Sequence, residues 1–80
     1  MLTDREEVDA VPLSEAIEGM EYIIKDISTD DEELEAFLFT LGCYVGEPIA
    51  VVFHISGGSI VSIKDGRYNI DKNLAKAIIV

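Results

Sequence analysis

Eighty residues are enough for one small domain, and a hydrophobic content of 49% excludes an intrinsically disordered chain. The formal net charge of −10, from 16 acidic and 6 basic residues, argues against nucleic acid as a partner, because phosphate recognition relies on Lys and Arg. No signal peptide is visible and no apolar run approaches the ~20 residues of a membrane span, so we expect a cytoplasmic protein that does not itself lie in the membrane.

The N-terminal part of the chain is predicted to be a tail followed by two short strands. Residues 1–10 lack hydrophobic periodicity and are acidic, so we expect a flexible acidic tail and a single domain over residues 11–80. Residues 12–14 are compatible with a short edge strand, and Glu18-Gly19 is a turn signal. Residues 21–27 are rich in β-branched and aromatic side chains, which favour a second strand.

An amphipathic helix is predicted after the second strand. Thr29 and Glu32 have the spacing of a capping box, in which a hydroxyl and a carboxylate bond reciprocal N–H groups at the helix start. Gly42 is placed to end the helix in the left-handed conformation. One apolar stripe at helical spacing consists of Leu34, Phe37, Leu38 and Leu41. Because an isolated helix of about 12 residues is marginal in water, we expect this stripe to cover the sheet as a lid.

A three-stranded meander is predicted for the second half of the chain. Its first strand alternates, which places four residues in the core: Ile49, Val51, Phe53 and Ile55. Gly57-Gly58 and Asp65-Gly66 match two-residue hairpin turns before the strands at residues 59–64 and 67–70. Asp71 is expected to cap a short helical turn.

The predicted last strand, residues 77–80, can close the sheet against the first. The predicted fold class is therefore mostly β: a small β-barrel with one amphipathic α-helix after the second strand.

The residues offer little material for catalysis or for metal binding. His54 is the only histidine and Cys43 the only cysteine, and no nucleophile motif is present, so we predict no enzymatic activity and no catalytic residue. Cys43 and His54 are weak candidate ligands, because Zn and Fe(II) accept thiolate and imidazole, but two ligands are too few for a site. The alternative is a buried Cys43 and a His54 on the solvent-exposed face of its strand. We expect no cofactor, with weak Fe(II) binding as the alternative.

An acidic cluster lies at the start of the predicted helix and consists of Asp30, Asp31, Glu32, Glu33 and Glu35. Its carboxylates could bind Ca²⁺ or iron weakly, but EF-hand spacing is absent. Helix capping and solvation are the alternative explanation of the cluster.

Apolar residues outside the helix stripe predict a docking surface. Phe39 lies off the stripe, and Tyr44 and Val45 extend the same surface into the following loop. An exposed aromatic beside a loop is a common anchor of small interfaces, so we predict partner binding by these three residues. A second layer of core beneath the helix is the alternative.

Read in order, the motifs resemble those of the FeoA family, ferrous iron transport protein A, whose members are small SH3-like barrels. The matching residues run from Pro12 to Val80 and include Pro12-Leu13-Ser14-Glu15-Ala16, Gly19, Leu38, Leu41-Gly42, Gly46 and Ala77-Ile78-Ile79-Val80. Two departures stand out. The family often has Pro-Gly where this chain has Glu18-Gly19 and Val45-Gly46, and many members are basic where this chain has Ile63-Lys64-Asp65.

The resemblance implies a cytoplasmic, non-enzymatic accessory of ferrous iron uptake that docks on the cytoplasmic part of the FeoB permease, as a monomer or weak dimer. Because similar barrels form the C-terminal domains of iron-dependent repressors, the alternative is a transition-metal-binding sensor or regulatory SH3-like domain. A module that binds extended, Pro-rich peptides is a third hypothesis. The chain contains no Trp, which argues against the aromatic groove that such ligands need.

Overall fold

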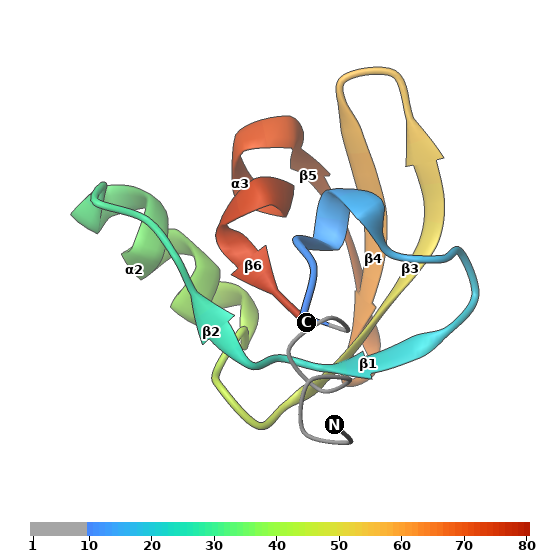
Figure 1. The fold of residues 1–80 in the computed structure, drawn as a ribbon, viewed down its shortest axis with the longest axis horizontal. Helices are drawn as coiled ribbons and strands as arrows, with labels where there is room; N and C mark the ends of the chain where they lie inside the picture. Colours follow the sequence, from blue (N-terminus) through green and yellow to red (C-terminus); the bar gives the residue numbers. More distant parts are fainter. Residues whose placement is uncertain (1–9) are drawn as a thin grey trace, which may run out of the picture.

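The computed structural model describes residues 10–80, so residues 1–9 of the predicted tail lie outside the described residues. The elements follow in the order η1 (Leu13–Glu15), β1 (Glu21–Ile23), β2 (Asp26–Ile27), α2 (Glu32–Leu41), β3 (Pro48–Ile55), β4 (Gly58–Ile63), β5 (Gly66–Asp71), α3 (Lys72–Ala77) and β6 (Ile78–Ile79). One antiparallel sheet has the strand order β1-β3-β4-β5, and β2 pairs with β6 in a second sheet (Figure 1). The fold is mostly β, as predicted, but two separate sheets do not confirm a closed barrel.

The second predicted strand is divided into β1 and β2, which belong to different sheets. The Ile24 N–H donates to the carbonyl of Glu47, just before β3, at 2.9 Å. The next N–H, that of Lys25, donates to the Ile79 carbonyl of β6 at 2.7 Å. Because successive residues of an extended chain direct their N–H groups to opposite sides, one continuous segment serves both sheets.

The first predicted strand, at residues 12–14, is wrong. Pro12 is extended, with φ −68° and ψ 150°, but Leu13–Glu15 then form a 3₁₀ turn, in which the Glu15 N–H donates to the Pro12 carbonyl at 2.9 Å. This turn buries the Leu13 side chain in the core. The predicted contact with the last strand is found as one antiparallel bridge between Pro12 and Ile79.

Helix α2 has the predicted C-terminal end but a different N-cap. Gly42 adopts the left-handed conformation with φ 96°. At the other end the Asp31 carboxylate, and not Thr29, accepts from the N–H groups of Glu33 at 3.0 Å and Leu34 at 3.2 Å. Thr29 Oγ1 accepts only from the Asp31 N–H, at 3.1 Å. Asp31 directly precedes the first helical residue and therefore reaches the free N–H groups better.

The stripe of α2 packs against the core through Leu34, Leu38 and Leu41, but the helix does not lie over the four-stranded sheet as the predicted lid. Leu38 is buried, but Leu34 and Leu41 are half-buried and Phe37 is exposed. Figure 1 shows α2 beside β2, away from the four-stranded sheet, which instead contacts α3. The α3 helix is capped by Asp71, as predicted, through its carboxylate and the Leu74 N–H at 2.9 Å. No helix in the described part of the chain is long and apolar enough to cross a membrane.

A β-bulge overturns half of the predicted core alternation in β3. Val51 pairs with Val61 of β4, but the next pair joins Phe53 and Ile60, so Val52 is an extra residue. An extra residue inverts the alternation of side chains beyond it. Ile49 and Val51 are buried as predicted, whereas Phe53 and Ile55 are exposed.

Both hairpin turns lie one residue earlier than predicted. Ile55 pairs with Gly58, and Ile63 pairs with Gly66, so the turn residues are Ser56-Gly57 and Lys64-Asp65. Within the turns, Gly57 has a φ of 85° and Lys64 a φ of 54°. Gly58 and Gly66, which the sequence placed in the turns, are the first residues of β4 and β5.

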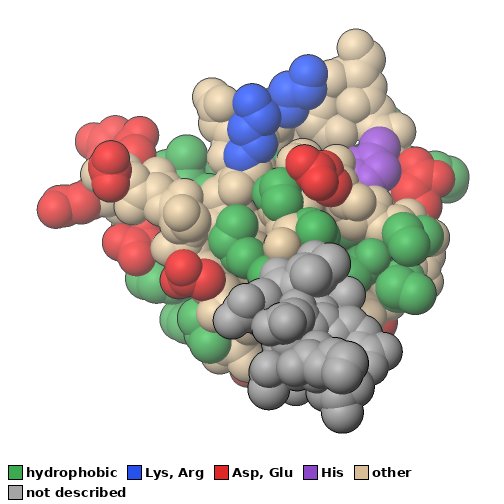
Figure 2. All heavy atoms as spheres, viewed as in Figure 1, with side chains coloured by type: hydrophobic (Ala, Val, Ile, Leu, Met, Phe, Trp, Pro, Cys, Tyr) green, Lys and Arg blue, Asp and Glu red, His purple; other side chains and the backbone are tan. Residues whose placement is uncertain are grey.

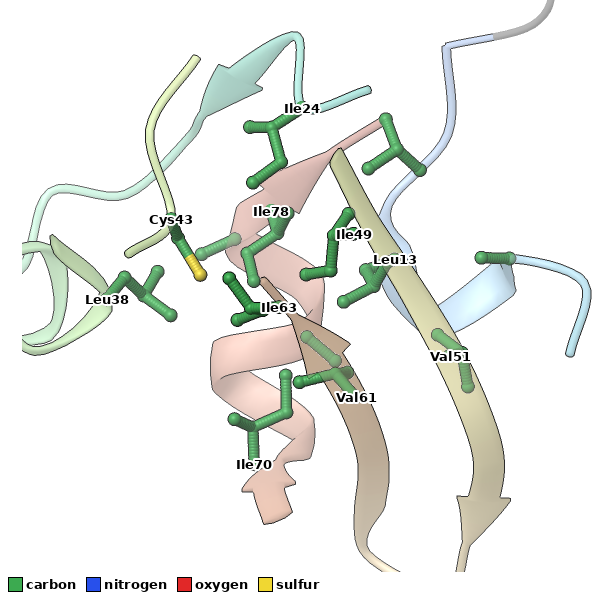
Figure 3. Packing of buried hydrophobic residues seen from close by; sticks show 14 residues of the cluster. Leu13, Ile24, Leu38, Cys43, Ile49, Val51, Val61, Ile63, Ile70 and Ile78 are labelled. Carbon is green, nitrogen blue, oxygen red and sulfur yellow. The ribbon is translucent and has the colours of Figure 1, made fainter. Parts of the chain in front are cut away.

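The core lies between the four-stranded sheet and the segments η1, α3 and β6. Figure 3 shows side chains from these elements meeting around Ile49, Ile63 and Ile78, with Leu38 and Cys43 closing the side next to α2. The core therefore fixes the end of α2 and the loop that follows it.

Candidate functional site

The three predicted docking residues gather on the surface at the C-terminal end of α2. The rings of Phe39 and Tyr44 stack with centroids 5.3 Å apart and an interplanar angle of 7°. Phe39 is 38%, Tyr44 48% and Val45 64% exposed, so the alternative of a second core layer is wrong. We call these three residues the aromatic patch. Their role in docking stays a prediction.

Backbone hydrogen bonds hold the aromatic patch in place. The Gly42 N–H donates to the Phe39 carbonyl and the Cys43 N–H to the Leu38 carbonyl, each at 3.0 Å. Only the left-handed Gly42 allows this reversal at low cost, and it brings Tyr44 back over Phe39. The Gly46 N–H then donates to the Ile24 carbonyl at 2.8 Å, which fastens the loop to the body of the domain.

Fixed aromatic rings at the surface can bury apolar area against a partner with little loss of conformational entropy. The salt bridge found within residues 10–80 joins Glu47 and Lys64, which are 3.9 Å apart and exposed, and such a surface pair adds little stability. The chemistry of this surface is thus mainly apolar contact, with the Tyr44 hydroxyl as its one polar side-chain group.

Cys43 is buried in the core (Figure 3), which agrees with the alternative to metal binding that the sequence analysis gave. Burial raises the pKa of the Cys43 thiol from 9.0 to about 11, so the thiol stays protonated at neutral pH. Metal binding requires the thiolate, and the structure therefore gives Cys43 the character of a small hydrophobe.

His54 is half-buried on β3, so it keeps part of the solvent access that the sequence analysis gave it. Its ring is nevertheless held by two contacts, because Nε2 lies 2.7 Å from the Ala16 carbonyl and Nδ1 lies 3.0 Å from the hydroxyl of buried Ser59. A carbonyl oxygen can only accept, so Nε2 donates to Ala16 and Nδ1 is left to Ser59. The His54 N–H also donates to the Glu18 carboxylate at 2.7 Å. The ring links the segment after η1 to the β3–β4 hairpin.

The two candidate metal ligands are not brought together as a site. Cys43 lies in the apolar core, and both ring nitrogens of His54 contact other protein atoms. Within residues 10–80 no three His, Cys, Asp or Glu side chains are close enough together to hold a metal ion. In the acidic cluster, Asp31 caps the helix, in agreement with the capping explanation.

Sequence reasoning missed a groove on another side of the domain. Its volume is about 610 Å³, and its walls come from β1 and from the two ends of the domain: Val11, Glu15, Ile17, Met20, Glu21, Tyr22, Ile23, Lys25 and Val80. The run of apolar residues around the Glu18-Gly19 turn was the available signal. Only the fold shows that Val11 and Val80 also line it.

The comparison with protein-family models shows the family of this chain. The FeoA domain model matches residues 11–80. The chain is similar to the crystal structure of an iron uptake regulatory protein, FeoA, with 30% identity over 88% of this chain and 92% of that one, and a TM-score of 0.78. It also resembles FeoA of Stenotrophomonas maltophilia complexed with zinc, an SH3 domain protein, with 18% identity, 82% and 84% coverage and a TM-score of 0.72.

A manganese-dependent transcriptional repressor has a TM-score of 0.79 at 20% identity, with coverage of 89% of this chain but 40% of the repressor. At this identity the likeness shows the fold alone. No curated protein sequence gives a significant match.

Proposed function

Because this chain belongs to the FeoA domain family, we propose that it is a cytoplasmic, non-enzymatic accessory of ferrous iron uptake that docks on the cytoplasmic part of a FeoB-type permease. The similarity to an iron uptake regulatory protein over nearly the whole of both chains supports the role in iron uptake. In this proposal ferrous iron is the cargo of the permease, and the accessory protein acts by contact without a bound metal.

The observation that carries the docking proposal is the stacked, exposed pair of Phe39 and Tyr44. Large aromatic side chains supply most of the binding energy in many small interfaces. The pair is held by the backbone hydrogen bonds of the loop after α2, so little ordering is needed when a partner covers it. We therefore place the centre of the contact on the aromatic patch.

The charge of the chain adds a requirement for the partner. With a formal net charge of −10, the protein attracts surfaces that are neutral or basic. On the face shown in Figure 2, acidic side chains gather over α2, whereas Lys and Arg lie over α3. Since the patch follows α2, we expect its partner to carry basic residues around an apolar centre, and we expect salt to slow the association.

The direct test measures binding to the immobilised cytoplasmic domain of the permease from the same cell. We expect the substitutions Phe39→Ala and Tyr44→Ala each to weaken binding by about tenfold, because each removes a buried aromatic contact. Phe53→Ala is the matched control, since Phe53 is 57% exposed but lies on β3 outside the patch. Equal binding by all four proteins would move the contact elsewhere, and absence of binding by the wild type would refute the proposal.

The sensor alternative has its own measurement. Anaerobic titration with Fe(II), followed by NMR, should leave the signals of Cys43 and His54 in place if the protein acts by contact alone. Shifts of these signals at micromolar metal would instead favour the metal-responsive role.

A further inference from the structure

The groove described above lies along an unpaired edge of the main sheet. Strand β1 is outermost in the order β1-β3-β4-β5, and no strand among residues 10–80 pairs with its other edge. Ile24 bonds toward the β3 side, through its N–H to Glu47 and its carbonyl to Gly46. By the alternation of an antiparallel strand, Glu21 and Ile23 direct their N–H and carbonyl groups to the opposite side. Glu21 and Ile23 line the groove together with Val11 and Val80.

Apolar side chains dominate the groove. Ile17, Met20 and Ile23 are between 49% and 62% exposed, and they are three of the nine large hydrophobic residues that are exposed within residues 10–80. Contiguous exposed apolar surface commonly marks a binding site. The volume of about 610 Å³ is within the range of ligand-binding clefts.

The charges of the groove decide between its possible occupants. Glu15 and Glu21 against Lys25 leave one net negative charge on the lining. The N-terminal residues 1–9 carry four acids and one Arg, and a second copy of the chain carries −10, so both are like-charged to the groove. A partner segment with basic residues has the complementary charge.

We propose that this groove binds an extended segment of a partner protein that carries basic and apolar residues two positions apart, on one face, and that adds as a strand to the free edge of β1. The apolar side chains would cover Ile17, Met20 and Ile23, and the basic ones would lie near Glu15 and Glu21. Main-chain bonds come from Glu21 and Ile23 only, because the Lys25 N–H is already bonded to the Ile79 carbonyl at 2.7 Å. This is strand addition, and it needs none of the aromatic groove of Pro-rich recognition. It stands whether or not a permease is the partner.

The test is an NMR titration of the full chain with a blocked hexapeptide in which Lys and Val alternate at every second position and Thr stands between them, so that Lys and Val share one face. We expect the signals of Ile17, Met20 and Ile23 to shift, and the same peptide with Glu in place of Lys to bind at least about tenfold more weakly. Ile23→Lys should weaken binding of the Lys peptide by about tenfold, because it places a cation in the apolar groove. Phe53→Lys, a matched change at an exposed site on β3, should have no effect.

Several results would overturn the proposal. They are the absence of shifts at about 1 mM peptide, shifts confined to α2, or equal binding of the Glu peptide. Contacts between residues 1–9 and Ile17 in the free protein would make the N-terminal segment the occupant. If the protein is a dimer that dissociates in the Ile23→Lys variant, the occupant of the groove is a second copy of the chain. Phe39→Ala should leave peptide binding unchanged, which separates failure at this groove from failure at the aromatic patch.

Discussion

Two glycines that begin neighbouring strands have very different room for a side chain. A Cβ on Gly58 would overlap the main-chain carbonyl oxygen of Ile70, which cannot move without breaking the β4–β5 ladder. A Cβ on Gly66 would lie 2.6 Å from the hydroxyl of Tyr68, a half-buried side chain that can turn away. We expect Gly58→Ala to reduce the free energy of unfolding by about 3 kcal/mol and Gly66→Ala by less than about 1 kcal/mol.

Urea denaturation of the two variants beside the wild type measures this difference. The Gly66→Ala variant controls for the general loss of chain entropy in the unfolded state, since both changes remove one glycine. Equal losses in the two variants would mean that β4 and β5 are not packed as closely as described.

The buried thiol of Cys43 gives the stability a dependence on pH. Its pKa is raised by burial from 9.0 to about 11, so the folded state favours the protonated thiol. This contribution is complete below pH 9 and is lost as the pH rises toward 11. Between about pH 8 and pH 10 the wild type should lose about 1 kcal/mol of unfolding free energy more than Cys43→Ala does. Parallel pH profiles for the two proteins, from urea denaturation, would contradict the burial of this thiol.

At the scale of the element, the hydrogen bonds at the N-cap of α2 predict how much each capping residue stabilises the helix. Asp31 accepts from two N–H groups of the first turn, whereas Thr29 accepts only from the Asp31 N–H. Asp31→Ala should therefore lower the free energy of unfolding by about 1 kcal/mol, and Thr29→Ala by about half of that. Chemical denaturation of both variants compares the two positions, which are two residues apart. A larger effect at Thr29 would restore the capping box that the sequence predicted.

The elements also show what the sequence could and could not predict. Gly42 ends α2, and Asp71 caps α3, because each depends on a local rule for one residue type. The bulge at Val52 has no such local signal, since Val51 and Phe53 continue a regular alternation. It arises from the pairing with β4, and it turns His54 toward Ser59 and leaves Phe53 in solvent.

For the whole molecule, the order of motifs along the chain predicted the family better than it predicted how the elements pack. The motif order predicted the family that residues 11–80 match, although α2 does not lie on the main sheet. The aromatic patch was predictable because Phe39, Tyr44 and Val45 are close in sequence. The groove was not, because its walls come from both ends of the domain and from β1, and meet only after folding.

The boundary of the domain is the last prediction, and it depends on the contact between those two ends. The N–H groups of Val11 and Val80 donate to each other's carbonyls, at 3.1 Å and 2.8 Å, and Leu13 is buried in the core. We propose that the domain begins at Val11, so removal of residues 1–10 should change the free energy of unfolding by less than about 1 kcal/mol.

Removal of residues 1–13 should cost at least about 3 kcal/mol, since it deletes a core leucine together with the bridge between Pro12 and Ile79. If that shorter protein fails to fold, Leu13→Ala in the full chain gives the same comparison, with an expected loss of about 3 kcal/mol. Thermal and urea unfolding of the three proteins decides the boundary. A large loss on removing residues 1–10 alone would place part of this segment inside the domain, since a tail without packed contacts contributes little to the folded state.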